Sequence, residues 1–81
     1  MEIKCGMIVK SVAGHDKDRF YLIVKIQGNK IYISDGKKRL LEKPKLKNKI
    51  HLKATKMVLD FEKIKTNKKL REALHKYNYK I

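Results

Sequence analysis

Residues 1–60 alternate between short apolar runs and turn-forming residues. The runs occupy residues 7–12, 20–26, 30–34 and 49–53. Their length, their β-branched content and the frequent turns between them are typical of strands. In the last run Ile50 and Leu52 alternate with polar residues as in a half-buried strand, and the Gly28-Asn29 pair favours a tight antiparallel hairpin with a primed turn. The pattern predicts a mainly β fold, a small barrel of four or five strands.

The C-terminal part of the chain changes to a helical period. The recurring apolar residues, at i, i+3, i+4 and i+7, are Leu70, Ala73, Leu74 and Tyr77. They predict one apolar helix stripe, and Thr66 or Asn67 is available as the N-cap. A helix of about ten residues is marginal alone, so we expect it to dock on the barrel or to order only on binding. The expected organisation is a barrel over residues 1–60 and a linker with the helix over residues 61–81, together one domain.

The balance of basic and acidic residues limits the kinds of partner that the protein can have. The chain of 81 residues has 22 Lys plus Arg and 8 Asp plus Glu, for a formal net charge of +14, whereas about 2–8 charges keep a small domain soluble. Such an excess indicates a polyanionic partner. The lone Cys5 excludes an internal disulfide, and no signal-peptide core or membrane-spanning stretch is evident. We therefore expect a cytoplasmic protein.

Residues 6–26 carry a strand, a glycine-containing loop and a returning strand. They read Gly-Met-Ile-Val at 6–9, Ser11, Ala-Gly at 13–14, a polar loop at 15–19 and Leu-Ile-Val-Lys-Ile at 22–26. This series resembles the KOW motif. Residues 31–39 and 51–55 extend the resemblance to KOW-containing large-subunit ribosomal proteins of archaea and eukaryotes and to their short bacterial relatives. The resemblance implies an SH3-like barrel that binds RNA. Gly14 stands at the motif's invariant glycine, where a glycine permits a positive φ or a close approach of the backbone to a phosphate or base. Asp18 replaces a second glycine but tolerates the left-handed region.

Two groups of residues are expected to contact RNA. The motif and its polar loop contribute Lys10, Ser11, Gly14, His15, Lys17 and Arg19. Residues 37–56 hold nine basic residues against one acid. This tract contributes Lys37, Lys38, Arg39, Lys43, Lys45, Lys47 and Lys49. Around Pro44 the alternate lysines would form a row of ammonium groups ~7 Å apart on one side of an extended chain, a spacing similar to that of backbone phosphates.

Among the aromatic residues, Tyr32 is the preferred candidate for stacking on a base, because strand alternation turns it away from its apolar neighbours. Phe20 and Phe61 are expected to be buried. The histidines and Cys5 lack the tight Cys-x-Cys or His-x-His spacings of zinc sites. The sequence has neither a phosphate-cradling loop nor a nucleophile elbow. We expect no metal, no cofactor and no catalytic residues, and we interpret the loop aspartates as turn formers.

The sequence favours an RNA-binding protein attached to ribosomal RNA of the large subunit, with ribosomal proteins as neighbours and a monomeric free state. Two alternatives stay open. One is an adaptor module of transcription or translation that touches nascent RNA and a protein partner, and the other is a non-specific binder of nucleic acid or other polyanions. Basicity along nearly the whole chain favours the ribosome, since an adaptor needs a less charged apolar patch. No membrane partner is expected, because the predicted helix is short and lacks Trp or Phe on its apolar face.

Overall fold

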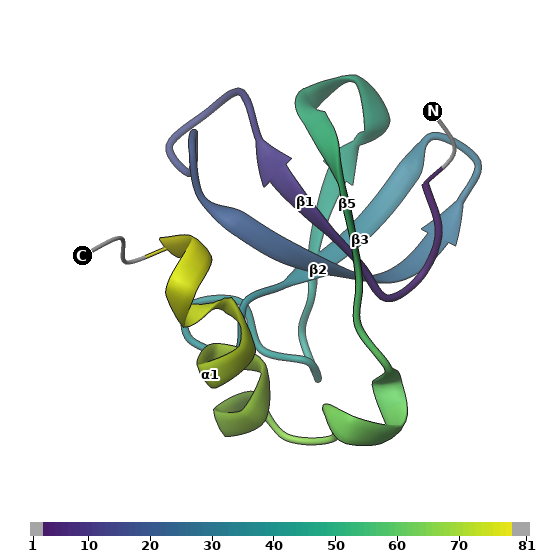
Figure 1. Cartoon of the computed structure of the whole chain (residues 1–81). Coiled ribbons are helices and arrows are strands. Elements are labelled where there is room, and N and C mark those ends of the chain that lie inside the picture. Colours follow the sequence, from purple (N-terminus) through teal and green to yellow (C-terminus); the bar gives the residue numbers. More distant parts are fainter. Residues whose placement is uncertain (1–2, 79–81) are drawn as a thin grey trace.

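Five strands and one helix dominate the computed structural model, which describes residues 3–78 (Figure 1). The strands are β1 (Met7–Ser11), β2 (Phe20–Gln27), β3 (Lys30–Ser34), β4 (Lys45–Asn48) and β5 (Leu52–Val58). The single 3-10 turns η1 (Lys49–His51) and η2 (Phe61–Lys63) follow β4 and β5, and the helix α1 (Asn67–Asn78) comes last. All neighbouring strands pair antiparallel in one sheet of order β4-β3-β2-β1-β5.

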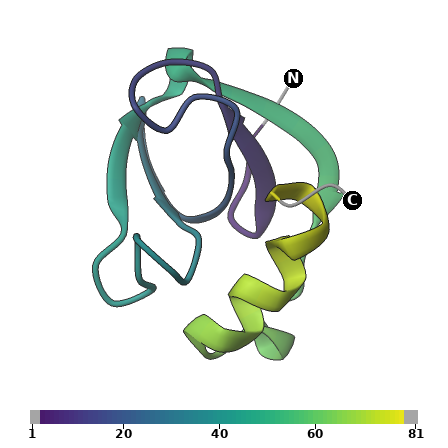
Figure 2. The same cartoon turned by 90° about the vertical axis from the view of Figure 1, so that its left-hand side faces the viewer.

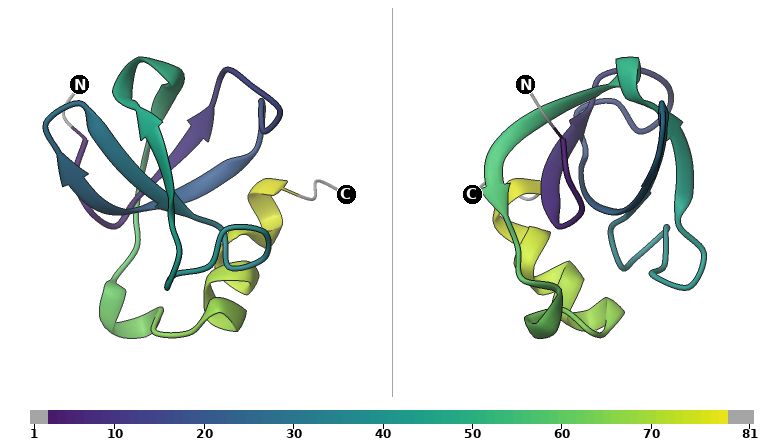
Figure 3. Two further views of the ribbon diagram at one scale, coloured as in Figure 1. Left: turned by 180° about the vertical axis from the view of Figure 1, so that it is seen from behind. Right: turned by 90° about the vertical axis from the view of Figure 1, so that its right-hand side faces the viewer.

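The sheet curls into a barrel because two of its strands are irregular. The pairing register shifts between Met7 and Val9 on β1 and between Ile23 and Lys25 on β2, and shifts of this kind bend a strand and increase its twist. β5 arches across the molecule (Figure 3), and η1 joins it to β4. The predicted fold is confirmed: the chain is mainly β, a small SH3-like barrel of five strands with a C-terminal helix.

β1 and β2 are buried on both faces. The interior cluster, inside the barrel, consists of Met7, Val9, Tyr21, Ile23, Ile31 and Ile33. The helix cluster, between the outer face and α1, consists of Ile8, Leu22, Ile64, Leu70 and Leu74. Because successive strand residues point to opposite faces, Ile8 packs under the helix while both its neighbours point into the barrel. This double burial explains why the first two runs are continuously apolar instead of alternating.

Helix α1 docks on the outer face of the barrel. Its N-cap is Thr66, whose Oγ1 accepts a hydrogen bond from the Lys69 amide at 3.2 Å. The predicted stripe packs against the sheet, with two leucines fully buried, each contributing about 1.5–3 kcal/mol. At the far end the Asn78 side chain accepts from the Phe20 amide at 2.7 Å and donates to the Phe20 carbonyl at 3.2 Å. Of the segment expected at 61–81, positions 79–81 lie outside the described residues.

Two expectations about apolar residues are wrong. The run at 49–53 is not one strand, because its first three residues form η1 and the Asn48 side chain accepts from the Ile50 amide. Ile50 is consequently 76% exposed. The chain has to turn there from one edge strand to the other, so alternation stops at the turn. Phe61 is 38% exposed because it begins η2 on the surface, whereas Phe20 is half-buried against the helix cluster.

Candidate nucleic-acid interface

The β1–β2 loop (residues 12–19) closes on itself. Gly14 has a φ of +86° and Asp18 a φ of +71°. The positive φ expected at Gly14 is thereby confirmed, and Asp18 adopts the left-handed conformation that this residue type tolerates. Backbone hydrogen bonds of 2.8–3.2 Å connect the amides of residues 17–19 to carbonyls of residues 11–16. The loop therefore presents its side chains from a well-defined backbone.

A partly buried ion-pair network ties this loop to β4. Asp16 Oδ1 lies 2.9 Å from Lys47 Nζ, and Asp16 Oδ2 lies 3.0 Å from Lys45 Nζ. Ser11 Oγ donates to Asp16 Oδ1 at 2.9 Å, and Lys47 Nζ also donates to the Ala13 carbonyl at 2.9 Å. Burial by itself raises the pKa of Asp16, but the hydrogen bonds from the two lysines and the serine outweigh it and hold the pKa well below its usual range.

This network corrects the expected row of solvent-facing lysines. Strand alternation does place Lys45 and Lys47 on one side of β4, but that side faces the β1–β2 loop, and Lys47 is only 9% exposed. The mostly buried Asp16 carboxylate in the loop pairs with both ammonium groups and holds them toward the loop. Ser11 is also fully buried, so its hydroxyl serves the loop. Lys43 is exposed ahead of β4, and Lys49 lies in η1, where its amide bonds the Asn29 carbonyl beside the β2–β3 turn.

The β3–β4 loop (residues 35–44) begins with a tight turn organised by Asp35. Its Oδ1 accepts hydrogen bonds from the amides of Lys37 and Arg39, both at 2.9 Å, so the expectation of a turn-forming aspartate holds here. Ser34 Oγ donates to the Arg39 carbonyl at 2.6 Å and closes the turn. The turn leaves three consecutive basic side chains exposed: Lys37, Lys38 and Arg39.

The two loops meet at the open end of the barrel, around a hollow of about 180 Å³. Figure 2 looks onto this end, with the β1–β2 loop above and the β3–β4 loop below. This basic hollow is lined by His15, Arg19, Tyr21, Lys38, Arg39 and Lys45, together with Asp16. Among the described residues, Asp16 is the one acid in the lining and is already paired, so the surface is positive. Tyr21 forms its buried floor, where burial, with Asp16 and Asp35 nearby, raises the pKa of the phenol to about 12.

Other predicted residues lie outside the hollow. Lys10 is 3.5 Å from Asp18 and its ammonium lies 5.9 Å from the centre of the Phe20 ring. Lys17 is exposed on the β1–β2 loop. Tyr32 is half-buried on β3, with the Lys25 ammonium 5.7 Å from its ring centre. The structure thus brings together part of the β1–β2 loop and part of the basic tract at residues 37–56. Tyr32 lies apart from both.

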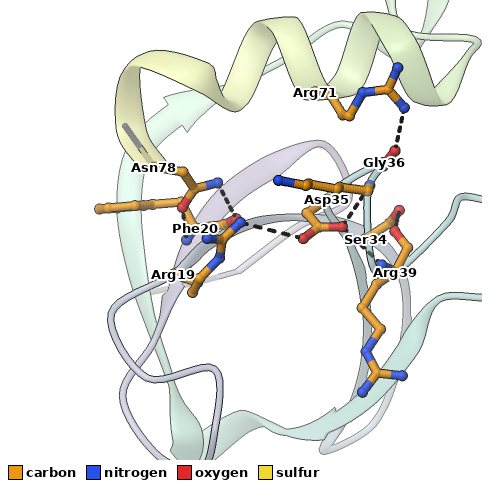
Figure 4. A network of polar contacts seen from close by, with 9 residues as sticks. Arg19, Phe20, Ser34, Asp35, Gly36, Arg39, Arg71 and Asn78 are labelled. Atoms are coloured by element: carbon orange, nitrogen blue, oxygen red, sulfur yellow. Dashed lines mark hydrogen bonds and ion pairs between the residues drawn. The ribbon is translucent and has the colours of Figure 1, made fainter. Parts of the chain in front are cut away.

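A larger cavity of about 590 Å³, here called the helix cavity, separates the β3–β4 loop from α1. It is lined by Arg19, Asp35 and Lys37 from the barrel and by Arg71, Glu72, Leu74, His75 and Asn78 from the helix. Arg71 Nη1 also donates to the Gly36 carbonyl at 2.9 Å, which fastens the loop to the helix (Figure 4).

Sequence reasoning missed the helical residues of this cavity. Arg71, His75 and Asn78 recur at i, i+4 and i+7, which is a polar face beside the apolar stripe. That periodicity was the available signal. Nothing local connects those residues to Arg19 or Asp35, because the connection exists only once α1 has docked.

No protein-family model matches the sequence, and a search of curated proteins finds no match. Within residues 3–78, no helix has the length and apolar character needed to cross a membrane. In the same part of the chain, no group of three or more His, Cys, Asp or Glu side chains is arranged to hold a metal ion.

Proposed function

We propose that this protein is a KOW-type RNA-binding barrel that attaches in the cytoplasm to ribosomal RNA of the large subunit. The observation that carries the proposal is the basic hollow. Side chains from two segments far apart in the sequence line one small concave site at the end of the barrel: His15, Asp16 and Arg19 from the first, and Lys38, Arg39 and Lys45 from the second. The resemblance described above implies RNA contact at one of these loops, and the net charge of +14 independently calls for a polyanionic partner.

The side chains of the hollow suit folded RNA. Arg19 and Arg39 carry planar guanidinium groups, which pair bidentately with phosphate or stack on exposed bases, and Lys38 adds a point charge. Because hydrogen bonds within both loops already order their backbones, little further loop ordering opposes binding. A polycation without a defined site would lack this advantage, so a shaped hollow favours RNA recognition over non-specific coating.

The test compares two double variants of equal charge. Lys38→Ala with Arg39→Ala removes two cations from the hollow, while Lys56→Ala with Lys63→Ala removes two exposed cations from β5 and η2 that do not line it. We expect the first pair to weaken co-sedimentation with large ribosomal subunits at least tenfold and the second less than threefold. Equal losses in two folded variants would indicate non-specific polyanion binding.

One observation favours an adaptor as the second candidate. Met57, Val58 and Phe61 are each about 40% exposed at the end of β5 and the start of η2, and Val58 and Phe61 both adjoin Gly6. An apolar patch of this kind is what a protein partner would need. The adaptor hypothesis predicts that Val58→Glu abolishes association with ribosomes but leaves affinity for purified ribosomal RNA unchanged. That outcome would replace the hypothesis of direct RNA attachment with the adaptor hypothesis.

A further inference from the structure

The helix cavity holds a buried hydrogen-bond acceptor that the fold does not satisfy. Asp35 is only 3% exposed. Its Oδ1 accepts from two backbone amides, but its Oδ2 has no hydrogen-bond partner among residues 3–78 and lies 3.9 Å from Arg19 Nη2, beyond hydrogen-bond distance. Figure 4 shows the carboxylate turned toward Arg19, below the helix. Buried polar atoms are normally satisfied, and an exception at the edge of a cavity calls for a ligand that donates.

The charges around the carboxylate call for a ligand that is also anionic. Arg19, Lys37 and Arg71 line the same cavity, against Asp35 and the rim residue Glu72. A fully ionised anion such as sulfate would meet the three cations but would leave Oδ2 without a donor, and hydrogenphosphate, which can donate a proton to Oδ2, would fill only a small part of the cavity. The ligand therefore combines hydrogen-bond donors at one end with a phosphate at the other. The volume of about 590 Å³ is in the range of small-molecule sites and accommodates a nucleotide.

We propose that the helix cavity binds a guanine nucleotide, with the Watson–Crick edge of the base against Asp35. Among the four bases, guanine alone presents two adjacent donors, N1–H and the N2 amino group, and both can point at the one unsatisfied oxygen, Oδ2, because Oδ1 already accepts from two backbone amides. Adenine and cytosine place a ring acceptor next to their amino group, and uracil flanks its single N–H with two carbonyls. An ionised carboxylate can only accept hydrogen bonds, so the ring nitrogens of adenine and cytosine and the carbonyls of uracil would repel it. Unstacked bases of RNA are commonly recognised along this edge.

The position of the cavity shows how RNA would supply the nucleotide. Arg19 lines both the helix cavity and the basic hollow, so an RNA backbone bound at the hollow passes next to the cavity entrance. Arg19 is one-third exposed at its side chain, and binding of the base would require this side chain to move away from Oδ2. If the guanine comes from an unpaired nucleotide of RNA, the inference rests on the proposed function. A free guanine nucleotide would be recognised by the same chemistry.

The first experiment uses the unmodified protein and GMP, AMP, IMP and inorganic phosphate, followed by amide chemical shifts in NMR. We expect GMP to bind at least tenfold more tightly than AMP, with shifts at Gly36, Arg71 and Asn78, and IMP, which lacks the N2 amino group, to lie between them. Equal binding of GMP and AMP, or the same shifts with phosphate alone, would overturn the proposal.

The second experiment tests the acceptor. Asp35→Asn keeps an Oδ1 for the two amides but replaces Oδ2 with a donor, and we expect it to abolish the preference for GMP. Asp60→Asn is the matched control, because Asp60 also accepts from a backbone amide but lies at η2, away from the cavity. Should Asp35→Asn fail to fold, the nucleotide comparison in the unmodified protein still decides.

A third arm separates the sources of the base. In a short unpaired RNA with one guanine, changing that guanine to adenine should weaken binding at least tenfold. RNA that binds with no effect of this change would overturn the inference and leave the proposed function standing. A preference for GMP in a protein that binds no RNA would instead support the cavity as a site for a free nucleotide and remove the proposed function.

Discussion

Lys47 is the residue whose position departs most from its sequence context. It lies in a lysine-rich tract, yet its ammonium is buried between the Asp16 carboxylate and the Ala13 carbonyl. A buried ion pair contributes little compared with an apolar pair, but removing one partner strands a buried charge and is strongly destabilising. The pair therefore fixes where the β1–β2 loop sits on β4.

Asp16→Asn should lower the free energy of unfolding by about 3 kcal/mol, because Lys47 then stays buried without its carboxylate. Adding Lys47→Met should recover part of that loss, since the second change removes the stranded charge. Urea unfolding followed by circular dichroism measures both effects. Strictly additive losses in the double variant would mean that the two residues do not act as a pair.

The same pair predicts a pH dependence. The pKa of Asp16 is lowered in the folded state, so its contribution is fully present above the ordinary aspartate pKa of about 3.9 and is lost as the pH falls through the folded value. The stability difference between the parent and Asp16→Asn should therefore be constant near neutral pH and shrink progressively below about pH 4. A difference that grew on acidification would contradict the lowered pKa.

For single residues, the backbone conformation could be predicted from the sequence better than the side-chain contacts. A positive φ at Gly14 and a tolerated left-handed φ at Asp18 follow from residue type alone. The inward turn of Lys47 depends on a carboxylate 31 positions earlier in the chain, and no local pattern reports such a distant partner.

At the scale of elements, the strands and the helix were predictable where periodicity and burial agree. The hairpin formed by β2 and β3 has a positive φ at Gly28 and none at Asn29, as in a type II′ turn, one of the two primed turns. The error at 49–53 arose because a single 3-10 turn between two edge strands preserves apolar spacing by chance. The helix cavity was not predictable, since it forms only between elements that are distant in sequence.

The β1–β2 loop can be tested with two glycine variants. Gly14→Val and Gly28→Val both place a β-branched residue at positive φ, and an added Cβ meets nothing closer than 3.5 Å at Gly14 and nothing within 4 Å at Gly28. Each should cost about 1–3 kcal/mol of backbone strain. We expect RNA affinity to fall at least tenfold in Gly14→Val and to stay within twofold in Gly28→Val. The comparison uses fluorescence anisotropy at a temperature where circular dichroism shows both variants folded, and equal losses would contradict a role for the loop.

At the scale of the molecule, the excess of 14 positive charges should appear in the salt dependence of binding. If about five basic groups engage phosphates, the slope of log affinity for duplex RNA against log salt should be roughly −4 to −5. Lys38→Ala with Arg39→Ala should make the slope about 2 less steep. Filter binding across a salt series gives both slopes, and a nearly flat dependence would exclude a phosphate-dominated interface.

The burial of β1 and β2 on both faces also determines when folding can be completed during synthesis. Ile8 and Leu22 are covered by Leu70 and Leu74, so the outer face of the barrel stays bare until the ribosome has synthesised α1. At about 5–20 residues per second, the interval between Leu22 and Leu74 lasts roughly 3–10 s. During that interval the nascent chain carries an uncovered apolar face, which is removed from water only when the helix emerges and docks.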